Sequence, residues 1–103
     1  MHRTANALFI LLSDVDVHTT LSIVGGVLPD SDLPYGYAQP TPSYKMELRN
    51  LMVSLTGEQF VSLLTNVIGL RKSLRASTNS RYVFDEKWAH LERTLALDGL
   101  EIT

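Results

Sequence analysis

The stretch from Tyr82 to Thr103, YVFDEKWAHLERTLALDGLEIT, decides the fold class of this chain. Within it, large apolar residues recur at intervals of four, three and four positions: Phe84, Trp88, Leu91 and Leu95. On an α-helix with about 3.6 residues per turn, this spacing gathers them on one side, which we expect to be buried. Polar and charged residues at the intervening positions predict a solvated opposite side.

The ends of this helix also carry signals. Asp85 is suited to be its N-terminal cap or an acid of its first turn, and Gly99 stands where a left-handed residue would close it. After Gly99, residues 100–103 alternate apolar and polar side chains like the beginning of a short strand. Because that strand ends without a turn or a partner, residues 1–103 are expected to be either one complete domain or the N-terminal fragment of a longer chain.

Length and composition limit the class of protein. A chain of 103 residues can bury one core, and 45% hydrophobic with 19% charged residues is typical of a globular domain. The absence of cysteine excludes disulfides, thiol nucleophiles and cysteine-based zinc sites, and it favours a cytoplasmic location. The apolar run at residues 7–12 is much shorter than a membrane span of about 20 residues, so no membrane partner is expected.

Helical spacing recurs through the rest of the chain. It predicts a deeply buried helix over residues 3–13 and a second helix over 43–55. Thr56 and Gln59 form a capping box that opens another helix, which Gly69 ends.

Residues 15–24 fit either a strand or a helix. Their β-branched alternation favours a strand, whereas Asp14 or Asp16 could cap a helix that Gly25 and Gly26 end. We favour the helix.

A long loop interrupts the helical pattern. The segment 27–42, VLPDSDLPYGYAQPTP, contains all four prolines, which exclude a helix. Tyr35 and Tyr37 either pin this loop to the surface or form an exposed aromatic pair for a partner.

The sequence therefore predicts an all-α fold: a compact bundle of four to five helices with a long Pro-rich loop and a short C-terminal strand. The expected core consists of the apolar residues on the helix faces: Leu8, Phe9, Leu12, Leu21, Leu48, Leu51, Leu55, Phe60, Leu64, Val67, Trp88, Leu91 and Leu95.

Charge is distributed unevenly along the chain. Residues 1–44 contain one arginine and four aspartates, whereas 70–81 contain four basic residues and no acid: Arg71, Lys72, Arg75 and Arg81. This basic stretch after a helix pair is compatible with helix-turn-helix binding to nucleic acid. The net charge of −2 favours instead a solvated helix end or a docking patch for an acidic protein surface.

Few residues suggest catalysis. The histidines are far apart, and no phosphate-binding loop or nucleophile elbow occurs. Asp14 and Asp16, together with His18, could hold a hard cation, and so could Asp30 and Asp32. Aspartates at such positions usually cap helices or turns. We expect no enzyme activity, no metal, no cofactor and no small-molecule substrate.

The C-terminal pattern resembles one known family. Its residues, in WAHLERTLALDGLEI, are Trp88, Leu91, Leu95, Asp98, Gly99, Leu100 and Ile102. The pattern looks like the end of the helical N-terminal domains of bacterial abortive-infection proteins of the AbiJ type, where an aromatic residue takes the place of Leu100. The resemblance implies an adaptor or sensor module in phage defence, joined to a toxic effector, and it implies no catalytic residue.

Two functions follow from these observations. The first is a non-enzymatic interaction or adaptor module that binds a protein partner or a second copy of itself, through the basic residues of 71–81 or through Tyr35 and Tyr37. The alternative is a small nucleic-acid-binding regulator of helix-turn-helix type, or a phage-encoded inhibitor of such proteins.

Overall fold

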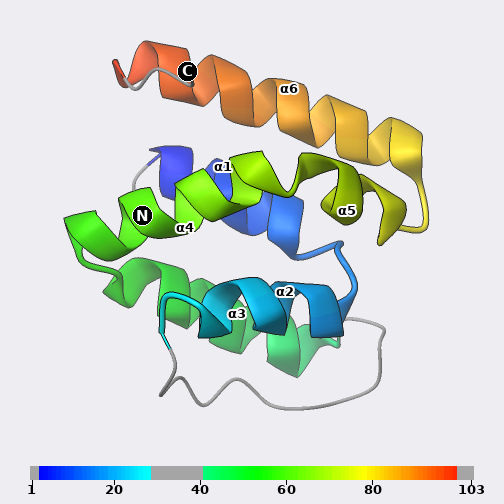
Figure 1. Cartoon of the computed structure of the whole chain (residues 1–103), viewed down its shortest axis with the longest axis horizontal. Helices are drawn as coiled ribbons and strands as arrows, with labels where there is room; N and C mark the ends of the chain where they lie inside the picture. Colours follow the sequence, from blue (N-terminus) through cyan, green and yellow to red (C-terminus); the bar gives the residue numbers. More distant parts are fainter. Residues whose placement is uncertain (1–2, 29–40, 100–103) are drawn as a thin grey trace.

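The all-α prediction is confirmed. The computed structural model describes residues 3–28 and 41–99, and these ranges contain six helices and no strand. The helices are α1 (Arg3–Leu12), α2 (Val17–Gly25), α3 (Pro42–Ser54), α4 (Gly57–Gly69), α5 (Arg71–Ala76) and α6 (Arg81–Leu97), as Figure 1 shows.

Helix α1 lies at the centre of the bundle. It packs against α6 on one side and α3 on the other, while α4 crosses in front of it (Figure 1). Its sequence, RTANALFILL, has no glycine or proline, and six of its ten residues are buried. An apolar helix of this kind is stable only inside a core, which explains its central position.

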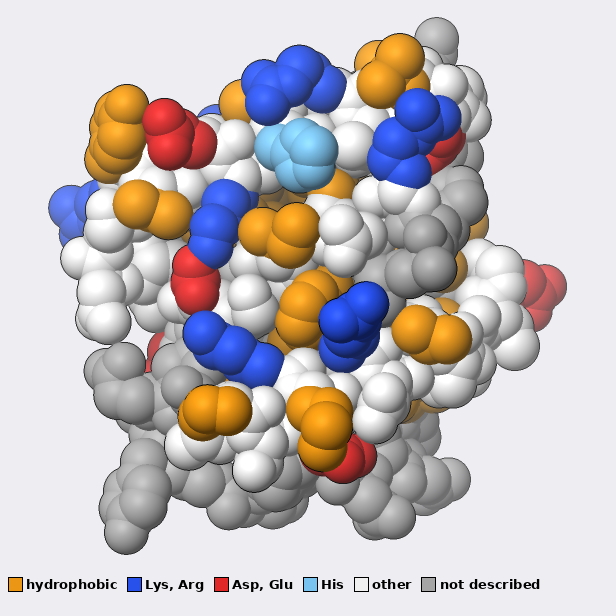
Figure 2. All heavy atoms as spheres, turned by 180° about the vertical axis from the view of Figure 1, so that it is seen from behind, with side chains coloured by type: hydrophobic (Ala, Val, Ile, Leu, Met, Phe, Trp, Pro, Cys, Tyr) orange, Lys and Arg blue, Asp and Glu red, His pale blue; other side chains and the backbone are white. Residues whose placement is uncertain are grey.

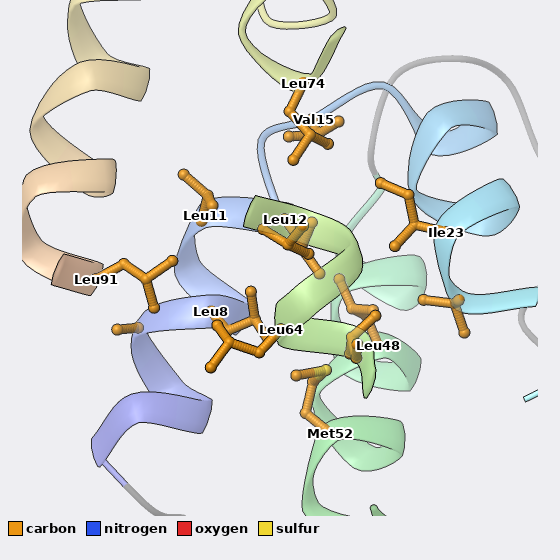
Figure 3. Packing of buried hydrophobic residues seen from close by; sticks show 14 of the residues in the cluster. Leu8, Leu11, Leu12, Val15, Ile23, Leu48, Met52, Leu64, Leu74 and Leu91 are labelled. Atoms are coloured by element: carbon orange, nitrogen blue, oxygen red, sulfur yellow. The ribbon is translucent and has the colours of Figure 1, made fainter. Parts of the chain in front are cut away.

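The core is one cluster with residues from all six helices. Figure 3 shows part of it, with side chains such as Leu8, Leu12, Leu48 and Leu64 converging from α1, α3 and α4. Eight of the residues expected in the core are buried: Leu8, Leu12, Leu48, Leu64, Val67, Trp88, Leu91 and Leu95. The other five pack against the cluster but remain partly exposed: Phe9, Leu21, Leu51, Leu55 and Phe60.

Side-chain caps fix where several helices begin. The helical reading of 15–24 is confirmed, with Asp16 accepting a hydrogen bond from the Thr19 amide at the start of α2. The capping box of Thr56 and Gln59 opens α4. Gly99 has φ +73°, the left-handed conformation expected after α6.

The expected beginning of α6 was wrong. This helix starts at Arg81, one turn before Asp85, because the Ser80 side chain accepts a hydrogen bond from the Val83 amide and caps the helix there. Asp85 thus lies in the second turn and is free to bind another element.

The expected number of helices was also too low within the described ranges. Residues 71–76 form α5, a helix of six residues whose Leu74 is fully buried. Such a short segment shows no periodicity of its own, and it is held by packing against α4 and α6.

Part of the predicted architecture lies outside the described residues. Of the loop at 27–42, Pro42 belongs to the first turn of α3, which Thr41 caps. Residues 29–40, with Tyr35 and Tyr37, and the strand expected at 100–103 lie outside the described ranges. Among the helices that the structure describes, none has the length and apolar character needed to cross a membrane.

Candidate functional site

The basic stretch after α4 is partly occupied by contacts within the chain. The Arg71 guanidinium lies 4.9 Å from the centre of the Trp88 ring, a cation–π arrangement. Arg75 donates two hydrogen bonds to the Asp85 carboxylate, at 2.9 and 3.1 Å. Both partners are on α6, so these arginines fasten α5 to α6.

The Arg75–Asp85 ion pair shifts the pKa of both groups. The hydrogen bonds from Arg75 hold the pKa of Asp85 below its ordinary value of 3.8, and those to Asp85 raise the pKa of Arg75. The other two predicted binding residues, Lys72 and Arg81, are exposed. The four basic residues therefore do not form one free cationic patch.

A polar pocket lies where the end of α1, the start of α3 and the start of α6 meet. Its volume is about 330 Å³. Its lining contains three apolar side chains, Leu11, Val83 and Phe84, and six polar or charged ones, Asp14, Lys45, Thr78, Asn79, Ser80 and Lys87. Pockets of this volume are at the lower end of the range for small-ligand sites.

Three charged side chains meet at this pocket. The Asp14 carboxylate forms a salt bridge with the Lys87 ammonium, and its other oxygen lies 3.8 Å from the Lys45 Nζ. Lys87 is the least exposed of the three, with 24% of its side chain accessible, against 43% for Lys45. Two lysines against one carboxylate leave an excess of positive charge at the pocket.

Burial lowers the pKa of Lys87 from its ordinary value. The contact with Asp14 acts in the opposite direction, since a neighbouring carboxylate favours the ammonium form. Lys87 is thus a partly buried cation, and the Asp14 carboxylate stabilises its charged form.

The start of α6 adds to the positive character of the pocket. Ser80 caps this helix of 17 residues and also lines the pocket. The first turn of a helix carries a partial positive charge from its free amide groups, which favours nearby anions. The Thr78 hydroxyl lies at the same edge and hydrogen-bonds to the Arg75 carbonyl at 3.1 Å.

The residues considered for a metal site do not come together. Asp14 contacts the two lysines, Asp16 caps α2, and His18 is exposed on α2. Across residues 3–28 and 41–99, no group of three or more His, Asp or Glu side chains is arranged to hold a metal ion.

Several large apolar side chains are exposed on the helices that border the pocket. On α3 these are Met46 and Val53, and on α6 they are Tyr82, Val83 and Leu97. Figure 2 shows the side of the molecule opposite α4 and α5, where hydrophobic and basic side chains lie interspersed. Methionine, arginine and aromatic residues are enriched in protein–protein interfaces, and this face contains all three kinds.

The sequence offers little signal for the pocket. Asp14 and Lys87 are 73 positions apart, and Lys45 lies on a third helix. Each of these residues has an ordinary local explanation, as a turn residue or as part of a solvated helix face. Only the packing of α1 between α3 and α6 brings them together.

Comparison with known proteins gives no further guide to function. No family model, no curated protein and no solved structure matches this chain. The resemblance of its C-terminal pattern to AbiJ-type domains therefore stays a prediction.

Proposed function

We propose that this chain is a non-enzymatic protein-binding module that uses the exposed faces of α3 and α6. The observation that carries this proposal is the set of exposed apolar side chains on these two helices, on either side of the polar pocket. Met46 is 58% exposed, Val53 62% and Tyr82 72%. Met46 and Val53 are seven positions apart, so they lie on the same side of α3, two turns apart, with the exposed Arg49 and Asn50 between them.

The partner is a protein segment that carries both apolar and acidic side chains. Basic groups stand among the exposed apolar residues, with Arg49 on α3 and Arg93 on α6, and the pocket between the helices has an excess of positive charge. Charge complementarity guides association and excludes basic partners, while the apolar contacts supply most of the affinity. An adaptor role in phage defence, as the AbiJ-like ending implies, would use such a surface.

Two contacts make nucleic-acid binding the weaker alternative. Arg71 is placed over Trp88, and Arg75 is paired with Asp85. A phosphate at Arg75 would compete with the Asp85 carboxylate, and a phosphate at Arg71 would have to fit its position over Trp88, which lowers the net gain. Lys72 and Arg81 alone provide few phosphate contacts.

A random peptide library displayed on phage tests the proposal. We expect enrichment of peptides that combine Asp or Glu with apolar residues. Their binding should be lost in the double variant Met46→Ser/Val53→Ser and kept in Val61→Ser, which changes an exposed valine on α4. Peptides without a common pattern, or peptides that bind the double variant equally well, would contradict it.

The same protein samples can test the other partners. The solution mass of the free protein, measured by light scattering, would show a dimer if the partner is a second copy of the chain. Duplex DNA binding that falls with salt, and falls further in Lys72→Gln/Arg81→Gln, would support the nucleic-acid regulator instead.

A further inference from the structure

The structure assigns a second binding capacity to the pocket between α1, α3 and α6. We propose that this pocket binds a small molecule with an oxyanion, a carboxylate or a phosphate, attached to a compact apolar body. This goes beyond the proposed protein-binding function, because the ligand is a small molecule, although Val83 and the positive charge of the pocket belong to both surfaces.

The pocket already holds an oxyanion of the chain itself, the carboxylate of Asp14. The Asp14 carboxylate lies between two ammonium groups, in contact with Lys87 and 3.8 Å from the Lys45 Nζ. Each ammonium has three N–H donors, and one carboxylate cannot use all six. Donors therefore remain on both lysines for a second anion.

The pocket carries an excess of positive charge. Its lining contains two lysines and one aspartate. An incoming anion would neutralise this excess. Because Lys87 is only 24% exposed, its interaction with an anion is screened less by water than that of a surface lysine.

The lining of the pocket also contains apolar side chains. Leu11, Val83 and Phe84 line the same pocket as the charged groups. A ligand that joins an oxyanion to an aromatic or branched apolar group can contact both kinds of side chain. Lysine ammonium groups act as point charges and accept carboxylate and phosphate alike, so the pocket selects the charge and size of the ligand.

The test uses phenyl phosphate, benzoate and inorganic phosphate as probes, at constant ionic strength with chloride as the reference anion. Binding is followed by amide chemical shifts in ¹H–¹⁵N NMR spectra. We expect saturable shifts at the pocket residues. Phenyl phosphate should bind more tightly than inorganic phosphate, because its ring also contacts the apolar side chains of the lining.

Charge variants separate this site from general surface binding. Lys45→Met should weaken phenyl phosphate about three- to fivefold, the contribution of one partly exposed ion pair. Asp14→Asn should strengthen it by a similar factor, because the competing internal carboxylate is gone. Lys72→Met, which removes an exposed lysine from α5, should have no effect and is the matched control.

Three outcomes would overturn the inference. The first is the absence of saturable shifts at the pocket in the wild-type protein. The second is equal weakening by Lys45→Met and Lys72→Met, which indicates diffuse surface attraction. The third is weaker binding in a folded Asp14→Asn protein, which indicates that Asp14 and the lysines serve only to hold α1, α3 and α6 together. None of these outcomes bears on the peptide library, so the two proposals fail separately.

Discussion

The Tyr44 side chain is a polar group in an apolar setting. Tyr44 is 3% exposed, and its hydroxyl has no hydrogen-bond partner among the residues that the structure describes. Burial raises its pKa, while the nearby Thr20 hydroxyl lowers it in part without reaching hydrogen-bond geometry. A buried donor without a partner lowers the stability of the folded state. Tyr44 therefore contributes through its ring and not through its hydroxyl.

Replacing Tyr44 by phenylalanine tests this reading. The free energy of unfolding should stay unchanged or rise by up to about 1 kcal/mol, because the ring is kept and an unsatisfied group is removed. Urea denaturation followed by circular dichroism measures the change. Tyr82→Phe is the control: it removes an exposed hydroxyl whose only recorded interaction among the described residues is with Glu86, and it should change stability little. A clear loss of stability in Tyr44→Phe would show that the hydroxyl has a partner.

Helix α4 depends on its first turn. Thr56 accepts a hydrogen bond from the Gln59 amide, and the Gln59 side chain accepts one from the Thr56 amide, at 3.2 and 2.9 Å. Thr56→Ala removes the cap and should cost about 1 kcal/mol of stability.

Thr65→Ala is the matched control on the same helix. The Thr65 hydroxyl bonds back to the Val61 carbonyl, and the residue is exposed in the helix interior, where alanine is the better helix former. This substitution should therefore leave stability unchanged or raise it slightly. Equal losses in both variants, measured by urea denaturation, would argue against a special role of the capping box.

The Arg75–Asp85 ion pair between α5 and α6 should make the stability of the protein depend on pH in the acid range. The pKa of Asp85 is held below 3.8 by Arg75, so the ionised carboxylate favours the folded state. This contribution is present above the unfolded pKa of about 3.8 and is lost as the pH falls through the lower folded pKa. Asp85→Asn should have a lower melting temperature than the wild type at neutral pH. This difference in melting temperature should shrink as the pH falls below 3.8.

Melting temperatures from neutral to acid pH at low salt give this comparison. Glu92→Gln removes an exposed carboxyl from α6 and controls for the change in net charge. A difference between wild type and Asp85→Asn that stays constant over the whole pH range would mean that the Arg75–Asp85 pair does not act through charge.

Long helices with local signals could be predicted from the sequence, and contacts between helices could not. The spacing of Phe84, Trp88, Leu91 and Leu95 identifies α6, and Thr56 with Gln59 marks the start of α4, because these signals lie within a few residues. Helix α5 was missed because its stability comes from Leu74 packing into the core. The pocket was missed for the same reason, since Asp14 meets Lys87 only after α1 packs on α6.

The first and last helices of the bundle are fastened to each other. Arg3 on α1 donates hydrogen bonds to the Asp98 carboxylate at 2.6 and 3.1 Å, and the Thr4 hydroxyl contacts its other oxygen. These residues are more than ninety positions apart in the chain. Helix α1 lies at the centre of the bundle and packs against α6. The core therefore forms only when both α1 and α6 are folded.

One shared core predicts that the whole bundle unfolds in a single step. Trp88 is the only tryptophan and is buried on α6, so its fluorescence reports α6, whereas circular dichroism reports all helices. In urea, both signals should give the same midpoint. Leu8→Ala, at a fully buried position of α1, should lower the free energy of unfolding by about 2 to 5 kcal/mol and shift both midpoints together. Leu97→Ala, at a residue 68% exposed on α6, should shift neither. If Leu8→Ala shifts the midpoint of only one signal, α3 and α6 do not unfold together through α1. The pocket that these helices border would then not be held by one cooperative core.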